Sequence, residues 1–202
     1  MKICLSCEGV TNTAAQRCGH CGALLLPTDA VHYPVRRGER DAGNALLGTV
    51  VDGKYRLQAV LGRGGLGTVF QAMHIGTLVT VALKLLHPRF AERPEYRTAL
   101  LPEARRAATV THAGCARLLD VGEAENGVAY LAMELVEGDT LDALMREGPL
   151  APGHAVQILL QIAEALAAIH DAGLVHCDLA PRNVMVATRG GALRVKVLDF
   201  GI

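Results

Sequence analysis

The sequence predicts an α+β fold in which a small cysteine-rich module precedes two lobes, the first an antiparallel sheet and the second partly helical. Three observations support this prediction. Two CxxC pairs fall within the first 21 residues, short runs rich in Val, Leu and Phe are broken by glycines between residues 55 and 134, and an apolar segment spans residues 152–172. Runs of the second kind are typical of strands, and an apolar segment of that length is typical of a buried helix.

The elements follow one another in a simple order along the chain. Strands are expected at 55–61, 68–74, 79–86, 118–121 and 128–134, and helices at 94–110, 140–146 and 152–172. The last helix has Pro152 near its first turn and Gly173 just beyond its end, the usual asymmetry of helix termini. Its apolar residues cover more than one face, so it must be buried on several sides.

Length and charge exclude several kinds of protein. With 202 residues, half of them hydrophobic, the chain can bury a core. Its 20 basic and 20 acidic side chains balance, so no charge field favours nucleic acid or an anionic membrane surface. The amino terminus lacks the apolar stretch of a signal peptide, and no run reaches the roughly 18 uninterrupted apolar residues of a membrane span. We therefore expect a cytoplasmic protein with no membrane span and no nucleic-acid partner.

Four of the six cysteines form two CxxC pairs, Cys4 with Cys7 and Cys18 with Cys21. Thiolates three residues apart on a tight turn can occupy two corners of a tetrahedron, and a second pair completes a four-sulfur Zn²⁺ site. Two disulfides or a redox role are the alternatives, but a non-secreted chain favours metal. We expect a zinc ribbon at 1–26, a linker at 27–48, a first lobe at 49–136 and a second lobe at 137–202.

A glycine loop of the form GxGxxGxV occupies residues 62–69, between two predicted strands. Glycines let backbone amides approach phosphate oxygens with no Cβ in the way. A dinucleotide site uses a similar pattern, but a helix follows the loop there, whereas a strand follows here. An ordinary glycine hairpin is the alternative. Lys84 ends the next strand, where a lone lysine would usually be a strand residue whose ammonium group reaches water.

Two further motifs make the pattern specific. Residues 176–183 read His-Cys-Asp-Leu-Ala-Pro-Arg-Asn, and residues 199–201 read Asp-Phe-Gly. With the glycine loop and the Val-Ala-Leu-Lys segment at 81–84, they resemble the ordered motifs of protein kinases. The resemblance covers about residues 51–202 and is greatest to bacterial Hanks-type serine/threonine kinases. It implies a protein-kinase-like bilobal fold and phosphoryl transfer from ATP, with Mg²⁺, to a protein hydroxyl.

The same resemblance implies roles for individual residues. Asp178 would accept the proton of the substrate hydroxyl, Lys84 would hold the α and β phosphates and pair with Glu103, and Asn183 and Asp199 would bind Mg²⁺. The implied nucleotide contacts are Leu61, Gly62, Gly64, Gly67, Val69, Ala82, Lys84, Glu103, Met133 as gatekeeper, Glu134 and Val136 of the hinge, and Met185. For the apolar residues among them, plain core packing predicts the same burial.

Several positions depart from the kinase pattern. Cys177 replaces the arginine that pairs with a phosphorylated activation loop, which argues against activation by loop phosphorylation. Ala180 replaces the lysine that neutralises the γ-phosphate, and Arg182 is expected to substitute for it, as an arginine at this offset does in tyrosine kinases. Pro102, which would cost about 3 kcal/mol in a helix interior, either begins or kinks the helix that carries Glu103.

The chain ends at Ile202, directly after the Asp-Phe-Gly motif. We therefore expect the amino-terminal part of a longer kinase, in which the helix at 152–172 is partly uncovered and the isolated chain is poorly soluble. Two other functions stay open. One is a catalytically inactive, nucleotide-binding fragment with a zinc ribbon, favoured by Cys177 and Ala180. The other is a small-molecule phosphotransferase, which residues 176–183 also fit but against which the glycine loop and Phe200 argue.

Overall fold

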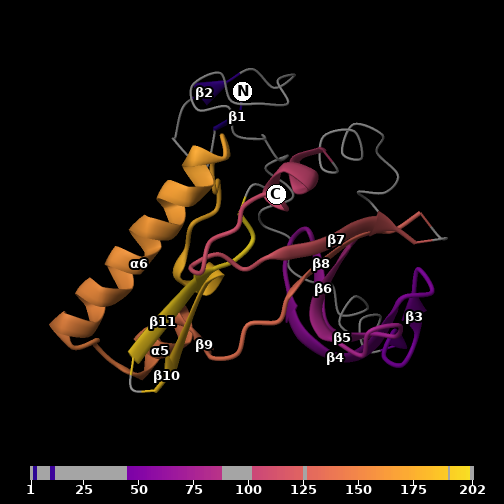
Figure 1. The fold of residues 1–202 in the computed structure, drawn as a ribbon, viewed down its shortest axis with the longest axis horizontal. Helices are drawn as coiled ribbons and strands as arrows, with labels where there is room; N and C mark the ends of the chain where they lie inside the picture. Colours follow the sequence, from indigo (N-terminus) through magenta and orange to yellow (C-terminus); the bar gives the residue numbers. More distant parts are fainter. Residues whose placement is uncertain are drawn as a thin grey trace. The chain divides into compact units, whose positions relative to one another are not determined.

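The structure is a computed structural model that describes residues 2–3, 10–11, 45–87, 102–124, 127–190 and 192–200. The chain divides into two compact units (Figure 1). Unit 1 comprises Met1–Pro102 and Leu118–Leu135, and unit 2 comprises Glu103–Arg117 and Val136–Ile202. Residues 103–117 belong to unit 2 although they precede β7 in the chain. Gly114 and Ala116 of this segment hydrogen-bond to Val197 of unit 2.

Unit 1 contains an antiparallel six-stranded sheet in the order β3-β4-β5-β6-β8-β7. Its strands are β3 (Val50–Val51), β4 (Tyr55–Arg63), β5 (Gly67–His74), β6 (Thr80–Leu86), β7 (Leu118–Glu123) and β8 (Ala129–Glu134). The five longer strands confirm the predicted ones to within two residues at each end. The two-residue β3 was not predicted, since so short a strand shows no alternation. A separate antiparallel pair joins β1 (Lys2–Ile3) to β2 (Val10–Thr11).

One face of the six-stranded sheet forms the core of unit 1. Successive side chains of a strand point to opposite faces, so every second residue shares a face. The core face carries Tyr55, Leu57, Phe70, Ala72, Val81, Leu83, Leu85, Tyr130 and Ala132. The residues between them, Lys84 among these, belong to the other face, which leaves that face of β5, β6 and β8 for chemistry.

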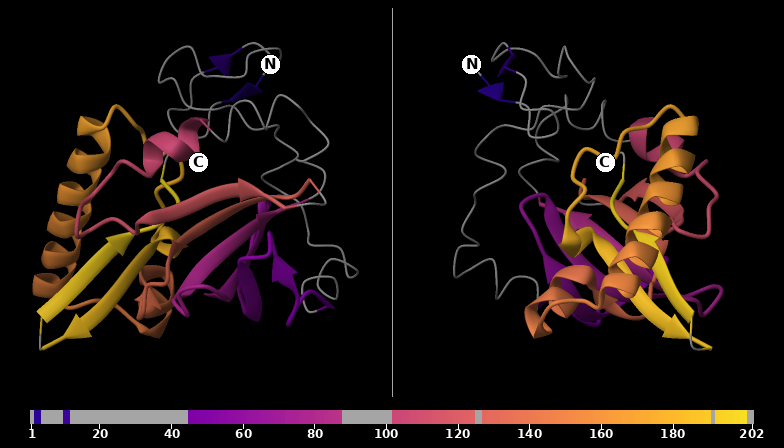
Figure 2. Two further views of the ribbon diagram at one scale, coloured as in Figure 1. Left: turned by 45° about the vertical axis from the view of Figure 1, so that its right-hand side comes forward. Right: turned by 90° about the vertical axis from the view of Figure 1, so that its left-hand side faces the viewer.

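The two outer parts of the sheet meet in a polar cluster, which we call the seam and which comprises Asp52, Lys54, Tyr55, Asp120 and Tyr130. The Tyr55 hydroxyl donates to Asp120 Oδ2 at 3.0 Å. The strands β4 and β7 that carry these residues are four spacings apart, about 19 Å in a flat sheet. The Tyr130 hydroxyl lies 2.6 Å from Asp52 Oδ2 and 3.1 Å from Asp120 Oδ2. The sheet must therefore curl strongly, as Figure 2 shows.

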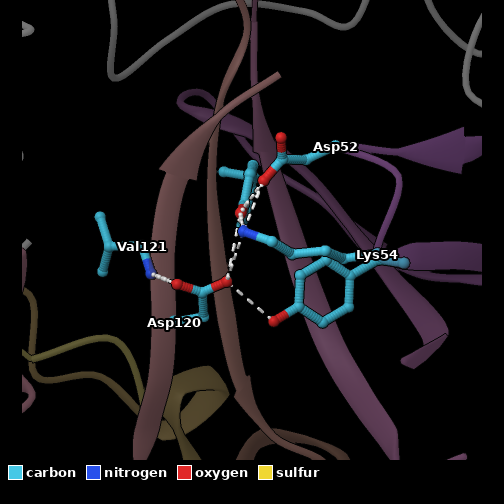
Figure 3. Close-up of polar contacts among 6 residues, drawn as sticks. Asp52, Lys54, Asp120 and Val121 are labelled. Atoms are coloured by element: carbon cyan, nitrogen blue, oxygen red, sulfur yellow. Dashed lines mark hydrogen bonds and ion pairs between the residues drawn. The ribbon is translucent and has the colours of Figure 1, made fainter. Parts of the chain in front are cut away.

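A single lysine faces both carboxylates of the seam (Figure 3). Lys54 Nζ lies 2.8 Å from Asp52 Oδ2 and 3.8 Å from Asp120 Oδ2. The hydrogen bond from Lys54 lowers the pKa of Asp52. Burial raises the pKa of Tyr55 to about 12 and also raises the pKa of Tyr130. At neutral pH Asp52 is thus an ionised acceptor and the two tyrosines are protonated donors.

Unit 2 combines helices with a small sheet. The helices are α5 (Leu141–Glu147), α6 (Pro152–Asp171) and the short 3-10 helix η1 (Pro181–Asn183), and the sheet has the order β11-β10-β9, from β9 (Asp139–Thr140), β10 (Val184–Arg189) and β11 (Ala192–Val197). The predictions of α5 and α6 are confirmed. No strand was predicted in the second lobe, yet the alternating Val-Met-Val and Arg-Val-Lys-Val runs on either side of Gly190 form a hairpin there.

Helix α6 lies along the β10–β11 hairpin (Figure 1) and is apolar on two faces. Its inner face buries Ile158, Ile162, Ala165 and Ile169, and the first two pack with Val184, Val186 and Val195 of the sheet. Its outer face exposes Val156, Leu159 and Leu160. By length and mean hydropathy this helix could cross a membrane, so the exclusion drawn from uninterrupted apolar runs was too strict. In the structure one face of the helix packs against the small sheet, and 22% of its apolar window is buried.

The outer edge of β11 is occupied by hydrogen bonds. The side-chain amide of Gln161 on α6 donates to the Leu193 carbonyl at 3.2 Å and accepts from the Val195 N–H at 3.1 Å. Two residues further on, the Val197 N–H donates to Gly114 and its carbonyl accepts from Ala116. Helix α6 and the 114–116 segment therefore complete the backbone bonding of β11.

We predict that Asp120→Ala destabilises the chain by about 2 kcal/mol, because it removes the acceptor of the Tyr55 hydroxyl and leaves Tyr130 and Lys54 with Asp52 alone. The control is Asp142→Ala, which removes an exposed ion pair with Arg146 at 2.6 Å and should cost about 0.5 kcal/mol or less. Urea unfolding followed by circular dichroism measures both values. Equal losses in the two variants would contradict a structural role for the seam.

Candidate active site

The glycine loop joins β4 to β5 as a hairpin. The strands stay paired as far as Arg63 and Thr68, and the Gly64 N–H then donates to the Gly67 carbonyl at 2.9 Å. A strand follows the loop, as the sequence predicts for this kind of phosphate-binding loop and in contrast to the helix of a dinucleotide site.

The glycines of this loop differ in how much space surrounds them. Gly67 lies so close to β6 that a Cβ there would clash with the Leu85 carbonyl oxygen. A Cβ on Gly62 or Gly64 would meet nothing nearer than 4.0 Å. Of these three glycines, packing thus demands Gly67 alone, and the open space around Gly62 and Gly64 would let backbone amides approach a phosphate.

Four of the predicted nucleotide residues share one face of the sheet in unit 1. Val69 of β5 pairs with Lys84 of β6, and Ala82 of β6 pairs with Met133 of β8. This is the face opposite the core cluster, because Ala82 and Lys84 alternate with the buried Leu83. Lys84 is only 7% exposed, so its side chain is largely shielded from water, and its partner Val69 is the last residue of the glycine loop.

The loop at residues 176–183 of unit 2 brings three predicted residues together. Arg182 Nη2 donates to Asp178 Oδ1 at 2.6 Å, and Asn183 Nδ2 donates to Asp178 Oδ2 at 3.0 Å and to its backbone carbonyl at 2.8 Å. The single turn of η1, begun by Pro181, folds residues 182 and 183 back toward Asp178. Both carboxylate oxygens of Asp178 therefore have a donor, although the Asp178 and Arg182 side chains are 60% and 62% exposed.

Leu198, the residue after β11, hydrogen-bonds to the same loop. The Leu198 N–H donates to the Asn183 carbonyl at 2.8 Å, which places Asp199 next to this loop. Cys177 and Asp199 have φ values of 65° and 53°, and they are the non-glycine residues of positive φ that the structure describes in unit 2. Left-handed conformations cost about 1–3 kcal/mol for such residues and gather at functional sites.

His176 is a buried residue of the loop that hydrogen-bonds to the loop's own backbone. It is 3% exposed, and its Nδ1 accepts from the Asp178 N–H at 3.3 Å, so its proton lies on Nε2. Burial lowers the pKa of His176. His176 therefore binds its second proton more readily in the unfolded chain than in the folded one. Its contribution to stability is present at neutral pH and decreases as the pH falls below the ordinary histidine pKa of about 6.5.

The other predicted residues take varied positions, and their roles stay predictions. Glu103 is buried in a helical stretch at 102–107 and accepts from Arg106 at 3.3 Å. The hinge at 134–136 is where the chain passes from unit 1 to unit 2. Met185 lies on β10, and Leu61 is exposed on β4.

One contact of the glycine loop was not predicted. The ring of His87, three residues after Lys84, lies 3.2 Å from the Gly64 carbonyl oxygen. No motif marks a histidine at this position, and only its place directly after the lysine strand could have indicated it.

The zinc prediction falls on residues that the structure does not describe. Cys4, Cys7, Cys18 and Cys21 all lie outside the described ranges. Within those ranges, no group of three or more His, Cys, Asp or Glu side chains could hold a metal ion. The zinc site therefore stays a prediction from the sequence.

Known proteins resemble this chain in both sequence and structure. The model of the protein kinase domain matches residues 55–202. Serine/threonine-protein kinase pkn2 of Myxococcus xanthus is 39% identical over 153 residues, which are 76% of this chain and 18% of that protein. Serine/threonine-protein kinase PknA of Mycobacterium tuberculosis is 40% identical over 161 residues, 77% of this chain and 37% of that protein. The crystal structure of the M. tuberculosis PknI kinase domain aligns with a TM-score of 0.66 at 32% identity, over 77% of this chain and 62% of that domain.

The curled antiparallel sheet, its glycine hairpin and the Asp178 loop define the kinase-like class of folds, as the sequence predicts. The chain belongs to the protein kinase domain family, whose model covers most of its length. It spans 18% and 37% of the two curated relatives named above.

We predict that Gly67→Ala lowers the free energy of unfolding by about 2 kcal/mol, because a methyl group must displace the backbone of β6. Gly64→Ala is the matched control and should change it by less than about 0.5 kcal/mol, since its Cβ enters open space. Thermal and urea unfolding of both variants test this difference. A tolerated alanine at position 67 would show that the close approach to Leu85 is not required.

Proposed function

We propose that the chain is an ATP-dependent protein serine/threonine kinase that transfers a phosphoryl group from Mg-ATP to a hydroxyl of a protein substrate. The observation that carries this proposal is the arrangement at Asp178, whose carboxylate is held by Arg182 and Asn183 in a loop of the form HxDLxxxN. The curated relatives are named serine/threonine-protein kinases, which favours a Ser or Thr hydroxyl as the acceptor.

Asp178 is suited to orient the substrate hydroxyl. Phosphoryl transfer passes through a loose transition state that needs a positioned acceptor more than a strong base. Arg182 donates to Asp178 Oδ1 in this structure, and a carboxylate oxygen has a second lone pair that can accept from a substrate hydroxyl. The ion pair is exposed and is worth only about 0–1 kcal/mol, so a phosphate anion can compete for the guanidinium. Arg182 would then replace the lysine that is absent at Ala180.

The residues at the end of the loop suit a magnesium site. Mg²⁺ prefers oxygen ligands, which Asn183 and Asp199 supply. Asn183 donates through Nδ2 to Asp178, which leaves its Oδ1 as the atom for a ligand. Lys84 and the amides of the glycine loop would hold the phosphates. Bound Mg-ATP would supply the transferred phosphoryl group, and its Mg²⁺ would neutralise the negative charge of the phosphates.

We predict that Asp178→Asn lowers phosphate transfer to casein from radiolabelled ATP by at least about 100-fold, because the amide no longer accepts the hydroxyl proton. Its affinity for Mg-ATP, measured by calorimetry, should stay within about twofold of wild type. Asp142→Asn, on the surface of α5, is the control and should retain transfer. An Asp178→Asn chain with full activity would overturn the proposal, and a wild-type chain that binds Mg-ATP without transfer would favour the binding-only alternative.

We also propose a structural Zn²⁺ site formed by Cys4, Cys7, Cys18 and Cys21. By sequence, Cys4 and Cys7 belong to the segment that joins β1 to β2, and these strands form an antiparallel pair. A CxxC in the connection of a hairpin brings two thiolates to one side of a metal, and the second pair completes the tetrahedron.

We predict one Zn²⁺ per purified chain, released by a thiol-modifying reagent and detected with a chromogenic chelator. Cys18→Ser combined with Cys21→Ser should remove the metal, because two thiolates cannot close a structural site. Cys177→Ser, which changes a cysteine of unit 2, should retain it. Disulfides at these four positions, or a wild-type chain without zinc after expression in zinc-containing medium, would contradict the site.

A further inference from the structure

Residue 87, directly after the end of β6, contacts the glycine loop at two points. Its backbone N–H donates to the Leu66 carbonyl at 3.0 Å, and its ring Nε2 lies 3.2 Å from the Gly64 carbonyl oxygen. A carbonyl oxygen can only accept, so the imidazole carries a proton on Nε2 and donates it in this contact. One residue therefore holds both the second half of the loop and its tip.

The tip of the loop has more need of such a contact than the second half. Gly67 is confined by the neighbouring Leu85 backbone, whereas the space around Gly64 is open. Gly64 and Gly65 also have more backbone freedom to lose than other residues when a ligand orders the loop. A hydrogen bond that orders the tip in advance reduces this entropic cost of binding.

We propose that His87 is a positioning residue, which holds the glycine loop in the conformation that receives the phosphates of a nucleotide. This inference rests on the proposed binding of ATP. Its structural basis is strand β6, which carries Lys84 and ends at Leu86, directly before His87. The same strand pairs with the loop, Gly67 with Leu86 and Val69 with Lys84. Strand β6 thus sets the lysine and the loop together, and His87 extends this control to the tip.

The test compares two substitutions in the full chain. His87→Leu removes the ring donor but keeps the backbone N–H, and His87→Gln keeps a side-chain N–H of similar reach. By calorimetry with Mg²⁺, we expect His87→Leu to weaken ATP binding about fivefold, as expected for one lost hydrogen bond. Its binding of adenosine, which has no phosphates, should not change. His87→Gln should restore ATP affinity to within about twofold of wild type.

The control is His74→Leu, because the ring of His74 bonds Thr77 in the turn between β5 and β6 rather than the glycine loop. This variant should bind ATP as wild type does. Unchanged ATP affinity in His87→Leu, or an equal loss for ATP and adenosine, would overturn the positioning role. Failure of the wild-type chain to bind ATP would instead count against the proposed function.

Hydrogen exchange gives a readout of the tether that needs no nucleotide. In His87→Leu, backbone amides within residues 64–67 should exchange at least about threefold faster than in wild type, while amides of β8 keep their rates. His87→Gln should restore slow exchange. Loop exchange rates that are the same in wild type and His87→Leu would show that the ring does not order the loop, whatever the outcome with ATP.

Discussion

The sheet of unit 1 closes on a shared hydrogen-bond acceptor, the carboxylate of Asp120, and much of the unit depends on this closure. Tyr55 from one side of the sheet reaches Asp120 on the outermost strand of the other side. Bulges accompany the bend, in β4 between Leu57 and Gly62 and in β7 between Leu118 and Asp120. A bulge increases local twist, so it lets a strand follow the curl without losing its pairing. The strands between these edges, β5 and β6, carry the glycine loop and Lys84.

Unit 2 positions its chemistry by a different means, a short chain of backbone and side-chain hydrogen bonds. The β10–β11 hairpin delivers Leu198 to Asn183, and Asn183 in turn donates to Asp178. Two left-handed residues, Cys177 and Asp199, stand at the two ends of this chain of contacts. Asn183 leads directly into β10, whose Val184 and Val186 pack in the core with α6, so the polar loop is joined to the apolar core.

The sequence predicted the motifs and the long strands but not the contacts that join distant segments. Alternation of Val, Leu and Phe marks each strand by itself, and glycine spacing marks the loop. The seam was invisible because Asp52 and Asp120 are 68 residues apart and neither belongs to a motif. The alternating residues around Gly190 did indicate the β10–β11 hairpin, but no strand was predicted there. His87 had none, because its role follows from the curl of a loop over a strand end.

The hydrogen bonds along the outer edge of β11 affect whether a second copy of the chain can pair with this strand. An exposed strand edge offers unpaired N–H and C=O groups to which another molecule can add a strand. Here the amide of Gln161 imitates a neighbouring strand at Leu193 and Val195, and the 114–116 segment does so at Val197. At the opposite edge, β9 is two residues long. Intermolecular pairing at the β11 edge is therefore opposed by a single side chain as much as by backbone.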